Sequence, residues 1–452
     1  MTERGVAGRV DEPPAVHVAR PSVDRKAGGL RPLAARLRLP GIVRRIVLTA
    51  ASNVAMTMAG ALGGIIIARS TGPTVRGEYS AVTSWLGIAI IVGEFGQPIA
   101  LCYYVARDSE RAREYLSTSR AMMVATGVVA LAAGMALAPL LSHGRPGLTV
   151  AYRIAFCCLL IQCFGDSYTW ALMARAFHLW NRIRVAQSLV SLAAVVVLWQ
   201  LRLLTLDTVL LALAGSLVIQ LCWSYWACRR TDLVPGRFTP EVVRPLAVYG
   251  VTQILAATPA TLNAYLDQLV LSVTVPPADL GRYSIAVSIT LLPAPLVYAI
   301  GYVLLPRLAA ENAVTASSRR LQRNSVLVSA GLATVILLPL ALAAPWLVPF
   351  VFGATYRAAV PLVWILTPGG VFLCCGQVVG NLLRGRGRQM VVARAEGTAV
   401  IATLAMLAAL IPVLGVTGAA IASTVPYCIS LAVMLRSLWR ISNLEEPDEG
   451  TP

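Results

Sequence analysis

The chain has 452 residues, of which 57% are hydrophobic and only 13% are charged, and its mean hydropathy is +0.71. A soluble domain cannot keep so large an apolar share away from water, whereas a bilayer accepts runs of about 20 apolar residues. The composition therefore predicts an all-α integral membrane protein. The net charge of +17 would favour nucleic acid in a soluble protein. Here it indicates membrane orientation, and no nucleic-acid partner is expected.

Apolar segments of spanning length fill the sequence between residues 46 and 438. They predict about 12 transmembrane helices joined by short loops. In chain order the predicted helices are 46–68, 79–104, 121–141, 152–174, 185–201, 208–228, 246–274, 283–305, 325–347, 359–383, 395–412 and 416–438.

Basic residues concentrate in alternate connections between these segments. With the N-terminus inside, the inner segments hold 31 of the 38 Lys and Arg residues and the outer segments hold the other 7. Cytoplasmic loops carry such an excess, so both termini are expected in the cytoplasm. Residues 1–45 form a basic tail without apolar periodicity, which is expected to be disordered. Residues 229–245 form a cytoplasmic linker, and residues 439–452 an acidic cytoplasmic tail.

The sequence contains a weak internal repeat. The segments Thr71–Ser80 and Val275–Ser284 share Pro, Gly, Tyr and Ser at a fixed offset of 204 positions. The repeat predicts two six-helix lobes, 46–228 and 246–438. Because each lobe has an even number of helices, both lobes enter the membrane in the same sense, and the repeat is parallel. Gly96 with Pro98, and Pro293 with Pro295, predict bends in the second and eighth helices.

Three acidic residues lie within predicted spans, where a carboxylate costs roughly 2.5–3.5 kcal/mol on insertion scales. Each acid has amide neighbours at helical spacing, and one further amide lies in the first helix. The set predicts a hydrated cavity whose acids bind H⁺ or Na⁺. The alternative is a protonated acid that only packs helices together. These candidates for ion coupling are Glu94 with Gln97, Asp166 with Gln162, Asp267 with Asn263, and Asn53.

Outer arginines are candidates for binding an anionic head group, because guanidinium binds phosphate through two parallel hydrogen bonds. Arg69, Arg153 and Arg282 occupy such positions, and the alternative is that they extend to membrane lipids. The sequence lacks a Walker A motif, an Asp-x-Asp pair and a His/Cys metal cluster. We therefore expect no enzyme activity, no metal site and no cofactor, with an H⁺ or Na⁺ gradient as the energy source.

Several short motifs resemble the oligosaccharide flippases of bacterial polysaccharide assembly. The first is Ile67-Ala-Arg-Ser-Thr-Gly-Pro-Thr-Val-Arg-Gly-Glu-Tyr79. The others follow in family order: Tyr265-Leu-Asp-Gln-Leu-Val-Leu271, Leu280-Gly-Arg-Tyr-Ser284, Val303-Leu-Leu-Pro-Arg-Leu-Ala309, Phe352-Gly-Ala-Thr-Tyr356 and Gly415-Val-Thr-Gly-Ala-Ala-Ile-Ala422. Each motif is weak, but together they extend over nearly the whole of residues 46–438.

The family belongs to the multidrug, oligosaccharidyl-lipid and polysaccharide exporter superfamily. The resemblance implies two lobes around a central cavity in the bacterial cytoplasmic membrane. It also implies ion-coupled movement of an undecaprenyl-pyrophosphate-linked oligosaccharide to the outer leaflet by alternating access. Implied partners are the lipid-linked glycan, membrane lipids, and possible polysaccharide polymerase and glycosyltransferases.

Other functions are compatible with the same sequence. A cation-coupled drug exporter belongs to the same superfamily. A membrane-embedded glycosyltransferase, polymerase or ligase would usually need a large outer loop or an acidic metal site. A scaffold without transport is argued against only by the three acids. The predicted first helix has neither the buried acid of many drug exporters nor the mid-helix arginine of typical peptidoglycan-precursor flippases, which favours the polysaccharide branch.

Overall fold

The computed structural model describes residues 39–298, 316–386 and 388–444. The predicted disordered tail, residues 1–45, lies outside these ranges up to residue 38, whereas its residues 39–45 belong to a helix. The end of the acidic tail and the second part of predicted helix 283–305 also lie outside. Every regular element described is a helix, as the composition predicted. In the first half these are α1 Leu39–Glu94, α2 Gln97–Arg107, α3 Ala112–Leu141, α4 Pro146–Arg175, α5 Phe177–Gln200 and α6 Leu206–Arg230.

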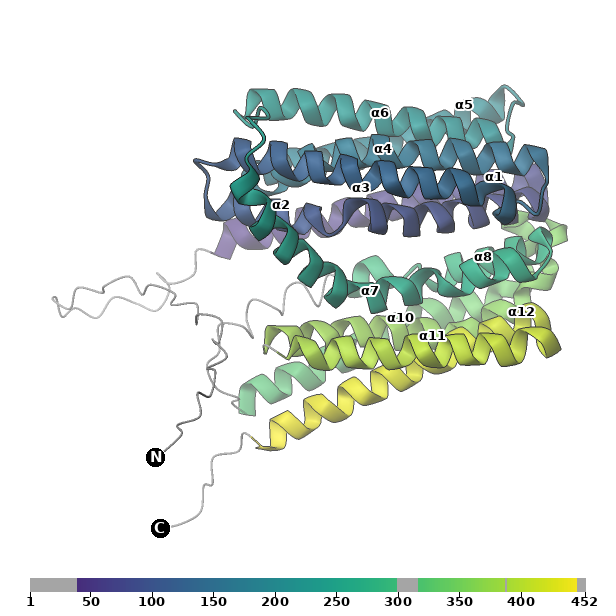
Figure 1. The fold of residues 1–452 in the computed structure, drawn as a ribbon. Helices are drawn as coiled ribbons and strands as arrows, with labels where there is room; N and C mark the ends of the chain where they lie inside the picture. The colour runs from purple at the N-terminus through teal and green to yellow at the C-terminus, as the bar shows by residue number, and fades with distance from the viewer. Residues whose placement is uncertain (1–38, 299–315, 387, 445–452) are drawn as a thin grey trace, which may run out of the picture. The chain divides into compact units, whose positions relative to one another are not determined.

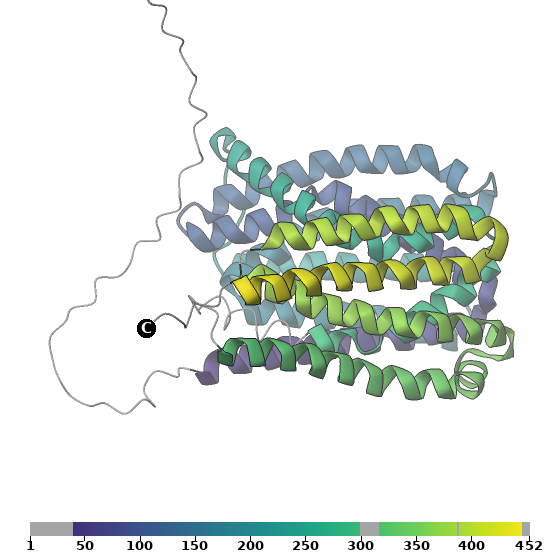
Figure 2. The ribbon, with the colours of Figure 1, turned by 90° about the horizontal axis from the view of Figure 1, so that it is seen from below.

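The second half begins with a short 3-10 helix, η2, at Pro240–Val242. It continues with α7 Val243–Thr274, α8 Pro277–Thr290, α10 Ala316–Phe352, η3 Ala354–Ala359, α11 Val360–Gly385 and α12 Gln389–Leu444. Most of the long helices described after residue 44 run along a common direction, whereas the first part of α7 is inclined to them (Figures 1 and 2). Helices α3 to α6 pack on one another, and α7, α11 and α12 form a second packed group with α10.

The described residues contain eight helices long and apolar enough to cross a membrane. Two of these spans have 46 and 52 residues, and each is long enough to cross twice at about 20 residues a crossing. Each is divided by one glycine at positive φ, Gly72 (φ 76°) in α1 and Gly415 (φ 56°) in α12. The predicted first loop, 69–78, is therefore reduced to one bend. The number of twelve crossings and the parallel repeat stay predictions.

The second and eighth predicted helices are both interrupted. Phe95 (φ 49°) and Gly96 (φ 68°) separate α1 from α2, and residues 291–293 form a turn after α8. The glycine at 96 tolerates the left-handed backbone that other residues avoid. A side chain there would also collide with α7, because a Cβ would stand 2.2 Å from the carbonyl oxygen of Gly250. The bends thus occur where Gly and Pro predicted them.

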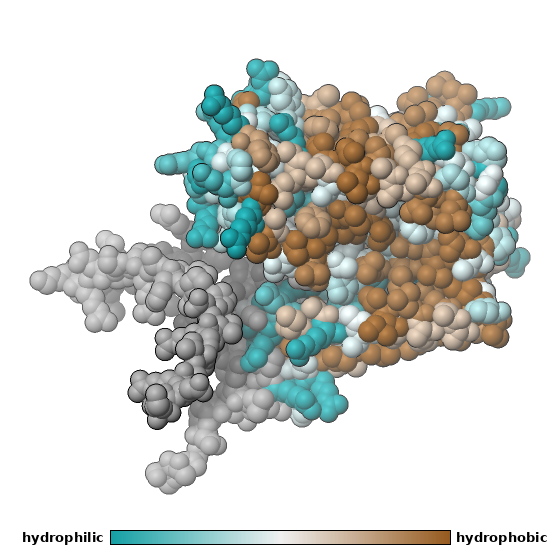
Figure 3. Space-filling model, viewed as in Figure 1, coloured by the Kyte–Doolittle hydropathy of each residue, from teal (hydrophilic) through white to brown (hydrophobic). Residues whose placement is uncertain are grey.

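The surface agrees with a membrane environment. Figure 3 shows hydrophobic side chains over the middle of the visible face and hydrophilic ones at its two ends. Large apolar side chains remain exposed on several helices, for example Leu140, Leu342 and Val413 at 72, 67 and 80%. Exposed apolar surface on this scale would be costly in water but is favourable in lipid. The protein is therefore a multi-pass membrane protein.

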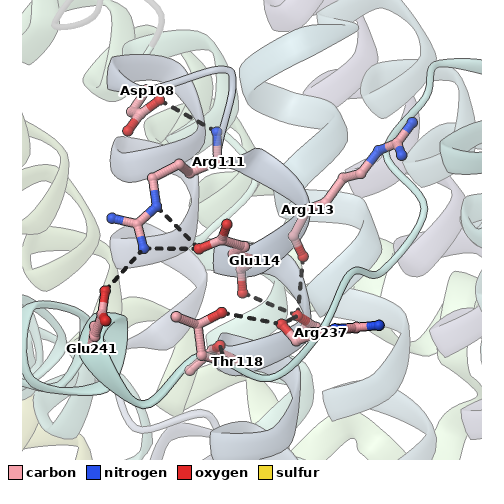
Figure 4. A network of polar contacts seen from close by, with 9 residues as sticks. Asp108, Arg111, Arg113, Glu114, Thr118, Arg237 and Glu241 are labelled. Carbon is pink, nitrogen blue, oxygen red and sulfur yellow. Dashed lines mark hydrogen bonds and ion pairs between the residues drawn. The ribbon is translucent and has the colours of Figure 1, made fainter.

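The predicted linker between the lobes is attached to the first lobe. Arg113 forms an ion pair of 3.0 Å with Asp232, and its carbonyl oxygen accepts a 3.0 Å hydrogen bond from the Gly236 amide. Figure 4 shows the neighbouring contacts, in which Arg111 lies between Glu114 (2.8 Å) and Glu241 (3.7 Å).

These contacts with the first lobe continue into the start of α7. The Tyr249 ring stacks on Tyr103 of α2 at 4.6 Å. Gln97 donates a 3.3 Å hydrogen bond to the Leu246 carbonyl oxygen. The first turns of α7 therefore pack with α2, although the sequence placed the start of the second lobe at residue 246.

Candidate functional site

A cavity of about 600 Å³ lies among α1, α5, α7, α8, α11 and α12, with polar groups set in a largely apolar lining. Asn53 and Arg184 line it from the first half of the chain, and Asn263 and Asp267 from α7. The remaining polar lining comes from Thr57, Thr290, Tyr298, Gln377, Glu396, Ser423 and Tyr427. The other lining residues are small or apolar. Segments more than 300 positions apart in the sequence thus line one cavity inside an apolar bundle.

Asp267 is the most deeply held acid of this cavity, with 6% of its surface exposed. Its Oδ2 accepts hydrogen bonds from the hydroxyl of Tyr283 (2.5 Å) and from Ser423 Oγ (3.2 Å). Its Oδ1 accepts from the Gln268 amide at 2.7 Å. A carboxyl with two hydroxyls around it presents hard oxygen atoms, which suit either a proton or Na⁺.

Asn263 and Glu396 form a second polar pair in the cavity. Asn263 Nδ2 donates to Glu396 Oε2 at 3.0 Å, and the Tyr427 hydroxyl donates to the Asn263 carbonyl oxygen at 3.1 Å. Sequence analysis missed Glu396 because the predicted span 395–412 places it at the very end of the helix. Helix α12 instead begins at Gln389, so Glu396 lies about two turns inside it. A helix start drawn one or two turns earlier would have placed this fourth acid well inside the span.

Glu94 and Asp166 form a separate site within the first lobe. Their carboxyl groups lie close together, and a proton held between two neighbouring carboxyls would relieve their repulsion. Gln162 donates to Asp166 Oδ2 at 2.5 Å, as its spacing predicted, and Gln220 lies 3.5 Å from Oδ1. This arrangement can hold one shared proton away from the central cavity.

Two other candidates lie elsewhere than the sequence suggested. Gln97 does not extend a polar stripe from Glu94, because the break at residues 95–96 places it on α2, where it bonds to α7. Asn53 lies in the central cavity beside the second-lobe acids. The structure thus divides the predicted polar set into a central group and a first-lobe pair.

Arg184 is the cation that sequence analysis overlooked. It was counted in an inner loop because the helix was expected to begin at residue 185, whereas α5 begins at Phe177. Its guanidinium lies 4.4 Å from the Trp180 ring centroid and near enough to Asp166 for a charge–charge interaction. Arg184 therefore lies between the first-lobe acids and the central cavity that it lines.

The three predicted rim arginines have different environments. Arg69 Nη1 donates to the Phe350 carbonyl oxygen at 2.7 Å and so links α1 to α10. Arg282 forms a 2.7 Å ion pair with Asp279 one turn earlier. Arg153 is exposed on α4. The three arginines lie apart from one another and do not form a common site.

Helices of spanning length around a cavity with polar groups in its lining define a multi-pass membrane protein. Residues 42–312 match the family described as Polysaccharide biosynthesis protein. The match covers more than half of the chain, so the chain belongs to this family, which confirms the resemblance seen in the sequence. A search of curated protein sequences gave no match.

Solved structures share the fold. A multidrug resistance MATE family transporter of the MOP superfamily in an inward-facing conformation superposes with a TM-score of 0.72 at 15% identity, covering 89% of this chain and 99% of that chain. The lipid II flippase MurJ in an inward closed conformation gives 0.70 at 12% identity, covering 88% and 87%. An outward-facing MATE structure gives 0.59 at 14%, covering 89% and 96%. The fold is thus more similar to the two inward structures than to this outward one.

Proposed function

We propose that this protein is a flippase. It moves a polyprenyl-pyrophosphate-linked oligosaccharide across the bacterial cytoplasmic membrane for surface polysaccharide assembly, without covalent chemistry. The observation that supports this most is the cavity of about 600 Å³, which is within the roughly 300–1,000 Å³ usual for small-molecule sites. Such a volume accommodates a pyrophosphate and adjoining sugars, while the polyprenyl tail remains in lipid.

The lining suits both parts of such a head group. Arg184 supplies a guanidinium for the pyrophosphate. The amides of Asn53, Asn263 and Gln377 and the Glu396 carboxyl supply donors and acceptors for sugar hydroxyls. This division of roles supports a glycan-bearing anion over an apolar substrate.

Alternating access is supported by how the two halves of the chain meet. At the predicted outer end, Gly77 and Gly281 bring α1 and α8 into backbone contact. Several cavity residues, among them Asn53, Arg184 and Glu396, lie nearer the predicted inner ends of their helices. Substrate would enter from the cytoplasmic side and leave when the outer contact separates. Asp267 and the Glu94–Asp166 pair are the candidate sites for the coupling H⁺ or Na⁺.

A deletion strain tests the flippase function. It should lose a surface polysaccharide and accumulate lipid-linked repeat units that are accessible only from the cytoplasmic side. Plasmid-borne wild-type protein should restore both. A strain that keeps its polysaccharide would show the proposal to be wrong.

A cation-coupled drug exporter is the second candidate. The observation in its favour is that two carboxyl groups, Asp267 and Glu396, line the cavity, where Arg184 is the one arginine among the described lining residues. Cationic dyes would find acidic partners there. The same deletion strain discriminates, because loss of an exporter would make it sensitive to cationic dyes and leave its polysaccharide intact.

A further inference from the structure

Arg76 is a partly buried cation for which the described residues supply no counter-ion. It follows the Gly72 bend in α1, and its Nε is buried without a hydrogen-bond partner. Among the described residues its guanidinium makes neither a hydrogen bond nor an ion pair. Its neighbour is the Tyr79 ring, whose centroid lies 5.6 Å from the guanidinium carbon. An unpaired charge withdrawn from water is costly, so such a group usually has a function.

Neighbouring arginines at the same predicted outer end differ in this respect. Arg145 pairs with Glu78 at 2.8 Å, and Arg69 donates to the Phe350 carbonyl oxygen at 2.7 Å. Arg282 pairs with Asp279 through Nη1, but its Nε is buried without a partner, as in Arg76. Two guanidinium groups therefore each retain a buried, unused donor.

These two arginines come from different halves of the chain and lie beside one backbone contact. Tyr356 of η3 is buried at the same end of α1. The Tyr356 hydroxyl donates to the Ala68 carbonyl oxygen at 3.2 Å, so it lies against α1. Beside Arg76, the Gly77 backbone contacts Gly281, the residue that precedes Arg282. The arginines thus flank the contact that closes the predicted outer end.

We propose that Arg76 and Arg282 bind a phosphate group carried by a lipid at this outer contact. Guanidinium donors and a phosphate satisfy each other through charge-assisted hydrogen bonds. The phosphate belongs either to the polyprenyl pyrophosphate of the substrate, which rests on the flippase function proposed above, or to a phospholipid. Because the two arginines lie on separate halves, binding stabilises the closed outer end, and opening weakens binding in return.

The test uses the full-length protein in phosphatidylcholine nanodiscs, titrated with undecaprenyl pyrophosphate. Arg76→Gln should weaken binding by at least about tenfold, since hydrogen bonds to charged groups contribute that much. Arg76→Lys keeps the charge but not the paired donors of the guanidinium, so its affinity should lie between those of the wild type and Arg76→Gln. Arg202→Gln, which removes an exposed arginine from the α5–α6 connection, is the control and should bind like the wild type.

A second measurement separates binding from a merely structural role. Undecaprenyl pyrophosphate should raise the melting temperature of the wild type and of Arg202→Gln, but much less that of Arg76→Gln. If Arg76 only packs on Tyr79, the variant will melt lower without ligand yet show the full ligand-induced rise, which would overturn the site.

A third arm replaces part of the phosphatidylcholine by phosphatidylglycerol. If a phospholipid can occupy the site, phosphatidylglycerol will compete and reduce the difference in undecaprenyl pyrophosphate affinity between the wild type and Arg76→Gln. If only the substrate binds there, that difference will stay constant. Equal affinities of the wild type and Arg76→Gln in every lipid would refute the site but not the flippase function. That function instead fails if the deletion strain keeps its polysaccharide.

Discussion

Alanine at Gly77 should favour the outward-open state. An ideal Cβ at Gly77 would stand 1.7 Å from the Pro277 carbonyl oxygen and 2.8 Å from the Gly281 amide nitrogen. The contact is reciprocal, because a Cβ at Gly281 would stand 2.0 Å from the Pro73 carbonyl oxygen. The atoms that collide are backbone atoms, so no side-chain rotation relieves the overlap.

The size of the effect follows from the geometry. Carbon and carbonyl oxygen approach to about 3.3 Å, so α1 and α8 must separate by roughly 1.6 Å for Gly77→Ala. Overpacking of this kind costs typically about 1–3 kcal/mol. If that cost falls only on the closed outer end, the outward-open population rises by roughly 5- to 150-fold. Gly281→Ala should act in the same direction.

The assay is the rate at which a membrane-impermeant maleimide, added from outside, labels a cysteine introduced at the cavity residue Thr57. The exposed native cysteines, Cys157, Cys222 and Cys428, are replaced first. Gly60→Ala is the matched control, because it also adds a methyl group to α1 but meets nothing within 4 Å. Faster labelling is expected in Gly77→Ala and not in Gly60→Ala. Unchanged labelling in a well-expressed Gly77→Ala protein, or an equal rise in Gly60→Ala, would refute the reasoning.

Three further outcomes are expected. Asp267→Asn should keep the shape of the site but abolish the dependence of transport on the ion gradient. The assay compares the flipping rate in vesicles with and without an imposed gradient, and an unaltered dependence would exclude Asp267 from coupling. Arg184→Gln should lower the affinity for the lipid-linked glycan by about 10- to 150-fold, because hydrogen bonds to charged groups contribute roughly 1.5–3 kcal/mol. An affinity within twofold of the wild type would contradict pyrophosphate binding by Arg184. Alkaline phosphatase fused after Arg145 should be active and after Ser317 silent, and the opposite pattern would invert the predicted topology.

Much of the fold follows from local sequence properties. Apolar runs of spanning length determine an all-helical membrane protein, because backbone polar groups in lipid must be satisfied within the segment. Gly96 and Pro293 marked the two interruptions, since their backbone preferences act locally. The acids Glu94, Asp166 and Asp267 stood out because charge in an apolar run is costly wherever the run packs.

Local sequence does not determine where a helix begins, and two functional candidates were missed for this reason. Arg184 and Glu396 were placed at the edge of a span, although α5 and α12 begin one to two turns earlier. Polar residues near the predicted inner surface look alike whether a helix continues past them or ends. Burial inside the bundle distinguishes the two cases.

Only the tertiary structure decided which polar groups meet. Asn53 shares a cavity with Asp267 and Glu396, Gln97 bonds to α7, and Arg76 and Arg282 flank the contact between Gly77 and Gly281. These partners lie far apart in the chain. Their encounter depends on the rotation and crossing of packed helices, which side-chain interdigitation sets over the whole bundle. Sequence periodicity determines the period of each helix but not which neighbour a given face meets.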